Sequence, residues 1–108
     1  MLLCALTVIV GCTVDKPTKS IRIAVASNME DAMDSLVVVF ERDYKISCDL
    51  SVSSSGILTS QIKNGAPFDI FLSANMDYPN ELYKEGLADK PRVYALGRLA
   101  LVFDRNFK

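Results

Sequence analysis

Short apolar runs alternate with segments of helical periodicity, and this alternation most constrains the fold of the chain. Residues 21–27 alternate large apolar side chains with smaller or polar ones, which predicts a β-strand. A second strand is predicted over residues 46–52, with Cys48, Leu50 and Val52 on one side. Residues 69–74 predict a third strand, apolar enough to be buried on both faces. Residues 92–103 predict a final strand, which Gly97 interrupts.

Each gap between these strands carries a helix signal. The first has apolar side chains repeating at helical spacing, namely Met29, Met33, Leu36, Phe40 and Tyr44. A short helix is predicted from Ile57 to Lys63, because Gly65 suits the position beyond its end. A third helix is predicted to start near residues 77–79 and to end before Gly86.

The start of the first helix has the form of a capping box. Ser27 would cap the helix, and the Glu30 side chain would reach back to the Ser27 backbone N–H. The sequence therefore predicts that Ser27 has a local structural role.

Strands that alternate with helices predict an α/β fold with a mainly parallel sheet flanked by helices. Such sheets bind ligands at the carboxyl ends of their strands, where helices begin. Serines fall at three of these ends: Ser27, the cluster Ser53 to Ser55, and Ser73.

A helix start presents free backbone N–H groups and a partial positive charge, so an anion can bind there. Ser27 and Ser55 would add hydroxyl donors. No Lys or Arg lies in residues 24–29, 53–58 or 72–76, so such a site would use neutral dipoles only. The structural alternatives are a helix cap for Ser27, a plain turn for residues 53–55, and strand-end or turn roles for Ser73 and Asp69.

Composition argues against several classes of function. The 108 residues include no histidine, which removes the usual general base and the commonest metal ligand. A serine hydrolase needs a base beside its nucleophile, and no lysine flanks the serine clusters, so we expect no enzyme. The net charge is −1 with no basic stripe, which argues against nucleic-acid binding. The three cysteines do not have the spacing of a zinc site.

The N-terminal residues have the pattern of a lipoprotein signal. An apolar run ends at Gly11-Cys12 and turns polar directly afterwards, which predicts that Cys12 becomes a lipidated first residue. The alternatives are a generic signal peptide or a hydrophobic tail. We expect residues 1–12 to be the signal segment, 13–20 a tether and 21–108 the folded domain. Cys48 would then be an unpaired thiol in or beside a strand.

Several motifs, taken in order, resemble one known family. They are Ala24-Val25-Ala26-Ser27, Ser54-Ser55-Gly56-Ile57-Leu58, the stretch from Asn64 to Ala74, Lys84-Glu85-Gly86-Leu87, and the stretch from Tyr94 to Val102. Together they resemble the periplasmic molybdate-binding proteins of ABC importers, over about residues 21 to 103.

The resemblance implies one lobe of a two-lobed periplasmic-binding-protein fold, truncated before its second lobe. It implies that Ser27 and Ser55 contact the oxygens of molybdate, or of tungstate, with Asn28 and Ser54 as further candidates. These contacts are to the oxygens of the oxyanion and not to a metal cation. The resemblance implies no cofactor. The implied partner is an ABC permease. The expected location is the periplasm or the outer face of the cell membrane, to which the lipid anchor would attach the protein. The alternatives are binding of another oxyanion such as sulfate, or a non-functional truncated lipoprotein remnant.

Overall fold

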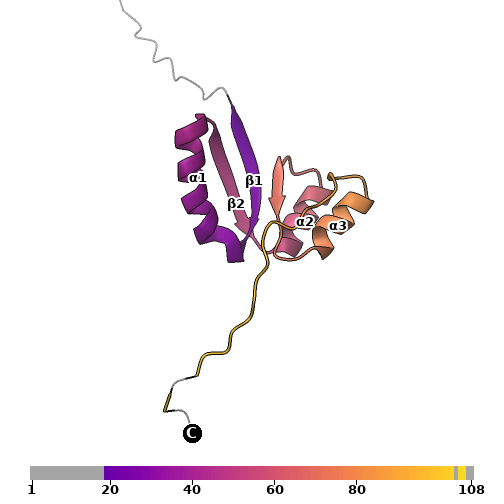
Figure 1. Ribbon diagram of the computed structural model, residues 1–108. Helices are drawn as coiled ribbons and strands as arrows, with labels where there is room; N and C mark the ends of the chain where they lie inside the picture. Colours follow the sequence, from indigo (N-terminus) through magenta and orange to yellow (C-terminus); the bar gives the residue numbers. More distant parts are fainter. Residues whose placement is uncertain (1–18, 104, 107–108) are drawn as a thin grey trace, which may run out of the picture.

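A parallel β-sheet organises the folded part of the chain (Figure 1). The computed structural model describes residues 19–103 and 105–106. Its strands are β1 (Ser20–Ala26), β2 (Ser47–Ser53) and β3 (Ile70–Leu72), in the order β2-β1-β3. Both pairings are parallel, so the predicted α/β class with a parallel sheet is confirmed.

Helix α1 (Glu30–Tyr44) covers the face of the sheet that carries the large side chains of β1. Ile23, Val25 and Met33 form the buried centre of this layer. Around them pack the partly buried side chains of Ile21, Met29, Val37, Cys48, Leu50 and Leu72. Leu36 and Tyr44, which the helical pattern placed on the same apolar face, are more than half exposed. The expected helix is confirmed, but the described residues cover its apolar face only in part.

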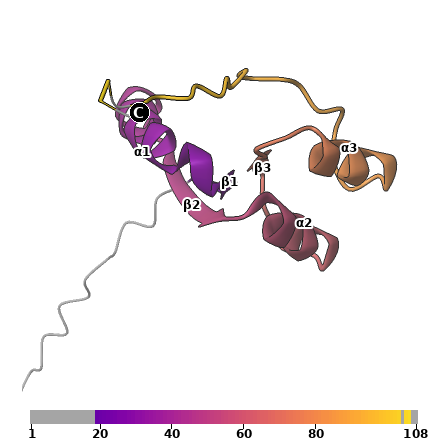
Figure 2. The same cartoon turned by 90° about the horizontal axis from the view of Figure 1, so that it is seen from below.

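The opposite face of the sheet carries small side chains and receives the other two helices. Ala24 and Ala26 are buried there, because their small side chains let α2 (Ser55–Lys63) approach the backbone of β1 closely. Figure 2 shows α1 on one side of the sheet and α2 with α3 (Asp77–Lys84) on the other. Leu58 of α2 and Leu82 of α3 are each 1% exposed and anchor these helices.

Glycines end α2 and α3 where the sequence predicted. Gly65 has a φ of +89° and Gly86 a φ of +72°, in the left-handed region that glycine enters without the steric cost of a side chain. The predicted bounds of both helices agree with the structure to within two residues, and α2 begins at Ser55, two residues before the predicted start. Among the described residues, no helix combines the length and apolar character needed to cross a bilayer.

The predicted capping box at Ser27 is wrong. The chain leaves β1 through a short 3₁₀ turn, η1 (Ser27–Met29), in which the Glu30 N–H donates to the Ser27 carbonyl. The cap position of α1 therefore falls on Met29, and no side chain caps either η1 or α1. The intervening 3₁₀ turn moves Ser27 out of the position from which a hydroxyl could cap the helix.

The predicted strand over residues 92–103 is also absent, and β3 is less buried than its sequence suggested. Residues 89–103 form no regular secondary structure, and Ile70 of β3 is 44% exposed. A strand needs a neighbour for its backbone groups, and within the described residues β3 pairs only with β1. The apolar sequence predicted a strand over residues 92–103, but among the described residues no strand pairs with that segment.

Candidate functional site

The serines that end the strands meet at one edge of the sheet. Ala26 pairs with Ser53, and Val25 pairs with Leu72, so the three strands end at nearly the same level. Ser27, Ser54 and Ser73 each follow directly. The structure therefore brings together at the carboxyl edge the serine clusters that the sequence placed at separate strand ends.

Ser55 is the most enclosed of the candidate ligand residues. It is 7% exposed, and its hydroxyl oxygen accepts a hydrogen bond from the Ala74 N–H at 2.9 Å. Because the oxygen is held as an acceptor, the hydroxyl hydrogen remains able to donate. Ser55 thus links α2 to the chain beyond β3 and offers a donor at the same point.

Ser54 caps α2 through its side chain. Its hydroxyl oxygen accepts from the Ile57 N–H at 3.3 Å, and its carbonyl accepts from Leu58. The N–H groups of Ser55 and Gly56, in the same first turn, have no intrahelical acceptor. The start of α2 therefore presents two backbone donors beside the Ser55 hydroxyl.

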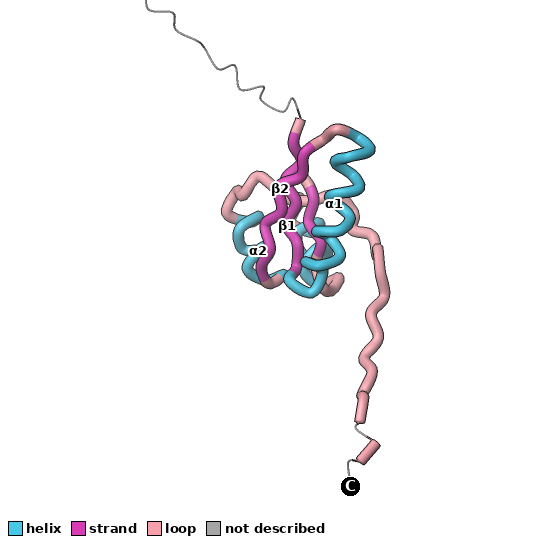
Figure 3. The backbone as a smooth tube through the Cα atoms, turned by 90° about the vertical axis from the view of Figure 1, so that its left-hand side faces the viewer, coloured by secondary structure: helices cyan, strands magenta, loops and turns pink. Residues whose placement is uncertain are grey.

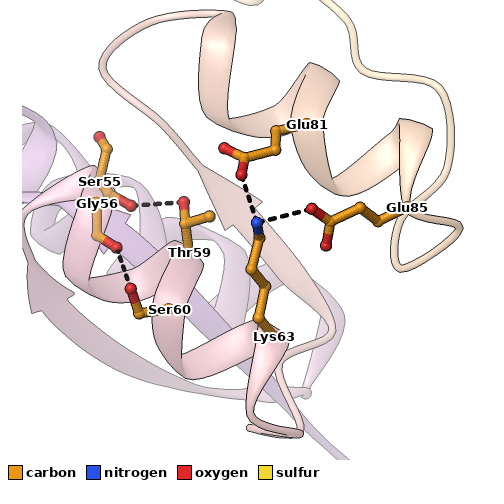
Figure 4. A network of polar contacts seen from close by, with 7 residues as sticks. All are labelled: Ser55, Gly56, Thr59, Ser60, Lys63, Glu81 and Glu85. Carbon is orange, nitrogen blue, oxygen red and sulfur yellow. Dashed lines mark hydrogen bonds and ion pairs between the residues drawn. The ribbon is translucent and has the colours of Figure 1, made fainter.

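Two further hydroxyls hold the first turn of α2 in shape (Figure 4). The buried Thr59 side chain donates to the Ser55 carbonyl at 2.7 Å, and Ser60 donates to the Gly56 carbonyl at 3.1 Å. A fixed first turn keeps its donors oriented, which favours binding of an anion because little ordering is then needed.

Ser27 contrasts with Ser55 in its surroundings. Its side chain is exposed and caps no helix, while its carbonyl accepts from Glu30. Asn28, the next residue, lines a cavity of about 460 Å³ at the same edge of the sheet. Both residues are exposed.

The segment 91–97 forms the other side of this cavity. The Tyr94 hydroxyl donates to the Ser73 carbonyl at 3.1 Å and so holds the segment against the end of β3. Arg92 also lines the cavity, together with Asn28 and Ser73. Arg92 is exposed, and neither Ser27 nor Ser55 lines this cavity.

No local sequence signal indicated this contribution of residues 91–97. Its apolar pattern was interpreted as a strand, and neither Arg92 nor Tyr94 belongs to a recognisable ligand motif. Only the chain path beyond α3 places them at the serine edge.

Ser73 and Asp69 have the structural roles that the sequence suggested. The Ser73 hydroxyl accepts from the Asn75 N–H at 3.4 Å. The Asp69 carboxylate accepts from the Arg22 backbone N–H at 2.8 Å, and the Asp69 N–H donates to the Arg22 carbonyl. These contacts fix the two ends of β3 rather than presenting free groups.

Ionisable groups with shifted pKa values lie away from this edge. The Lys63 amine donates hydrogen bonds to the carboxylates of Glu81 and Glu85, which raise the pKa of Lys63 and connect α2 to α3 (Figure 4). Burial, followed by the charges of Glu41 and Asp49, raises the pKa of the Cys48 thiol. No group of three His, Cys, Asp or Glu side chains that could hold a metal ion occurs among the described residues.

Comparison with known proteins gives a family for this arrangement. The sequence profile of the bacterial extracellular solute-binding proteins matches residues 21–107. The chain belongs to this family. Membership of this family supports the role of a transport-related binding protein.

Individual solute-binding proteins resemble the chain over its folded part. The molybdate-binding protein ModA of Azotobacter vinelandii is 39% identical over 83 residues, which are 75% of this chain and 33% of that protein. ModA of Rhodobacter capsulatus is 29% identical over 99 residues, 90% of this chain and 39% of that protein. The chain therefore spans between a third and two fifths of the length of these relatives.

Solved structures of solute-binding proteins show the same arrangement of elements. The periplasmic molybdate-binding protein of Azotobacter vinelandii superposes with a TM-score of 0.60 at 30% identity, over 61% of this chain and 29% of that one. The substrate-binding domain assigned to a molybdenum ABC transporter of Clostridium difficile gives 0.61 at 26% identity, over 63% and 30%. The fold expected from the sequence, part of a periplasmic-binding-protein fold, is confirmed.

The N-terminal predictions lie outside the described residues. They concern Cys12, the signal segment 1–12 and most of the tether 13–20. Cys48 lies in β2 as expected and is a free thiol.

Proposed function

We propose that this solute-binding protein binds molybdate at the carboxyl edge of its sheet and presents it to an ABC permease. The observation that carries the proposal is the buried Ser55 hydroxyl, which accepts from Ala74 and keeps a hydrogen to donate beside two free backbone N–H groups. Molybdate-binding proteins that resemble the chain supply the identity of the anion.

In this proposal, Ser27 and Ser55 donate their hydroxyl hydrogens to molybdate oxygens. The backbone N–H groups of Asn28 and Ser55 add further donors, and Ser54 supports them by capping α2. Hydrogen bonds to a charged partner contribute about 1.5–3 kcal/mol each. Neutral donors suit an anion that must also be released to a permease, because no buried counter-charge has to be left unpaired.

Tungstate would occupy the same donors, since it is also a tetrahedral dianion. Sulfate presents the same charge and geometry, so discrimination would depend on the size of the site. The protein makes and breaks no bond in this role, and it requires no cofactor.

The N-terminal residues complete the proposal. Residues 1–12 act as a lipoprotein signal that ends at Cys12, residues 13–20 form the tether, and residues 21–108 form the first lobe of the binding domain. Cys12→Ala should shift the protein out of the membrane fraction and remove the lipid mass from its N-terminal peptide. Cys4→Ala serves as the matched control, and equal membrane association of both variants would contradict lipidation.

The ligand is tested by nuclear magnetic resonance titration of the ¹⁵N-labelled chain with sodium molybdate. We expect saturable shifts of the amide signals of Asn28, Ser55 and Gly56, and loss of saturation in Ser55→Ala. Titration with tungstate and sulfate at equal ionic strength then ranks the three anions.

Three results would contradict the proposal. Equal shifts with sodium chloride would mean that only ionic strength is sensed. Stronger saturation by sulfate than by molybdate would assign the site to another oxyanion, and a complete lack of saturable shifts would favour a non-functional remnant.

A further inference from the structure

Gly56, the second residue of α2, has no backbone conformation that requires glycine. Among the described glycines, only Gly65 and Gly86 have positive φ values. A glycine within a helix is destabilising relative to alanine, so the backbone gives no reason for this residue. The reason lies in what surrounds the first turn of α2.

The Tyr78 side chain occupies the space beside Gly56. A Cβ atom at position 56 would lie 3.0 Å from the Tyr78 hydroxyl oxygen and 3.4 Å from Cζ, the ring carbon that carries it. The first distance is shorter than an ordinary van der Waals contact, so any side chain at position 56 would displace the phenol. The glycine therefore makes room for the Tyr78 hydroxyl against the first turn of α2.

Tyr78 reaches this position because α3 packs against α2. Figure 3 shows α2 on the face of the sheet opposite α1, and α3 lies beside α2 on that face. The Ala74 N–H donates to the Ser55 hydroxyl oxygen at 2.9 Å, which joins the first residue of α2 to the chain just before α3. At the other end of α2, the Lys63 amine donates to the Glu81 carboxylate on α3. Contacts at both ends of α2 thus hold α3, and with it Tyr78, in place.

The Tyr78 hydroxyl lies at the end of α2 that carries the proposed oxyanion donors. The Cα–Cβ bonds of a helix tilt toward its N-terminus, so a group beside the Cβ position of Gly56 lies on that side. The N–H groups of the first turn point the same way, and the Gly56 N–H is one of them. Tyr78 is partly buried, and within the part of the chain that the structure describes its hydroxyl has no hydrogen-bond partner. Its hydrogen can therefore be donated to a ligand.

We propose that Tyr78 is a ligand residue of the oxyanion site and donates its hydroxyl hydrogen to the anion beside the Gly56 N–H. The inference rests on the proposed oxyanion function and adds a donor to it. A phenol is a neutral donor, as the serine hydroxyls are, so the site gains a hydrogen bond without a positive charge. The donors then come from η1, α2 and α3, the three elements that directly follow the three parallel strands.

Molybdate titration of the ¹⁵N-labelled chain, followed by nuclear magnetic resonance, tests this role. Tyr78→Phe removes only the hydroxyl, and we expect it to weaken molybdate binding about tenfold, because one hydrogen bond to the anion is lost. Its urea unfolding should match that of the native chain, since no described residue bonds to this hydroxyl. Tyr83→Phe is the matched control, because it makes the same change on the same helix at a half-exposed position.

Gly56→Ala tests the same contact from the other side and keeps the backbone N–H of residue 56. We expect it to weaken binding about as much as Tyr78→Phe does, because the added methyl group displaces the hydroxyl. In the Tyr78→Phe background, the same alanine should change the affinity by less than about twofold, because the oxygen that it would displace is already absent. Circular dichroism checks that all variants are folded.

The possible failures are distinguishable from one another. Native affinity in Tyr78→Phe, together with lost saturation in Ser55→Ala, would remove Tyr78 from the site and leave the oxyanion function standing. Equal effects of Gly56→Ala in both backgrounds would also overturn the inference, because the alanine would then act on α2 and not through the phenol. A native chain without saturable shifts would overturn the oxyanion function and this role together.

Discussion

The two candidate ligand serines differ in what they contribute to the folded state. Ser55 is buried and accepts from the Ala74 N–H, whereas Ser27 is exposed and caps no helix. Ser55→Ala should lower the free energy of unfolding by about 1–3 kcal/mol, because that N–H loses its acceptor. Ser27→Ala should change it by less than about 0.5 kcal/mol.

Both substitutions should nevertheless weaken molybdate binding, by about tenfold or more, because each removes a hydrogen bond to a charged ligand. Urea unfolding and titration of the same samples separate the two effects. Ser51→Ala, on the exposed part of β2, is the control and should alter neither quantity. Unchanged affinity in Ser27→Ala would remove that residue from the site.

The Cys48 thiol provides a prediction about pH. Its pKa is raised above the ordinary value of 9.0 by burial and by the nearby carboxylates of Glu41 and Asp49. The folded state therefore favours the neutral thiol. The stability that this preference contributes is present below pH 9.0 and is lost as the pH rises through the folded-state pKa. The free energy of unfolding by urea should therefore fall more steeply above pH 9.0 in the native chain than in Cys48→Ala. Parallel plots of that free energy against pH for the two proteins would contradict this.

At the scale of elements, the sequence was informative wherever a structure depends on neighbouring residues. The helix ends at Gly65 and Gly86 follow from local backbone chemistry and are confirmed. The capping box at Ser27 failed because a 3₁₀ turn with the same local residues moved the cap position to Met29. The strand over residues 92–103 failed because pairing requires a partner strand, which the sequence of that segment cannot supply.

The candidate site could likewise be predicted from the sequence only in part. The positions of Ser27 and Ser55 at strand ends follow from alternation of strands and helices, and the parallel register then brings those ends together. The hydrogen bond that Ser55 accepts from Ala74 depends on a contact between distant residues. The same holds for the position of Arg92 beside the cavity that Asn28 and Ser73 line. No local pattern contains that information.

The contact between α2 and α3 gives a prediction at this scale. Lys63 forms ion pairs with Glu81 and with Glu85, the latter at 2.8 Å, and these raise its pKa. The protonated amine thus stabilises the folded state, an effect that is lost as the pH rises above the ordinary value of 10.5 through the folded-state pKa. At neutral pH, Lys63→Met should lower the melting temperature slightly at low salt, and the difference should shrink as salt screens the charges.

Lys84→Met is the matched control, because Lys84 lies in the last turn of α3 outside these ion pairs. A difference between Lys63→Met and the native chain that is independent of salt would assign the effect to packing of the lysine stem instead.

At the scale of the whole molecule, residues 91–97 line a cavity with Asn28 and Ser73, but the candidate donors Ser27 and Ser55 do not line it. The molybdate-binding relatives are about three times longer than the matched region, so they have further residues that could surround a ligand. We expect the 108-residue chain to bind molybdate weakly, with a dissociation constant above the submicromolar range. Isothermal titration calorimetry checks this, and submicromolar affinity would show that one lobe suffices.

A chimera tests the same point from the opposite direction. Residues 21–103 would replace the matching segment of the Azotobacter vinelandii protein, to which the chain is 39% identical over 83 residues. If the serine edge is a competent half of the site, the chimera should bind molybdate about tenfold or more tightly than the 108-residue chain, because donors on both sides can then enclose the ion. Ser55→Ala in the chimera should abolish that gain, with Ser51→Ala as the control. A folded chimera that binds no better than the chain alone would mean that this edge lacks the geometry of a molybdate site, even though its fold and serines match.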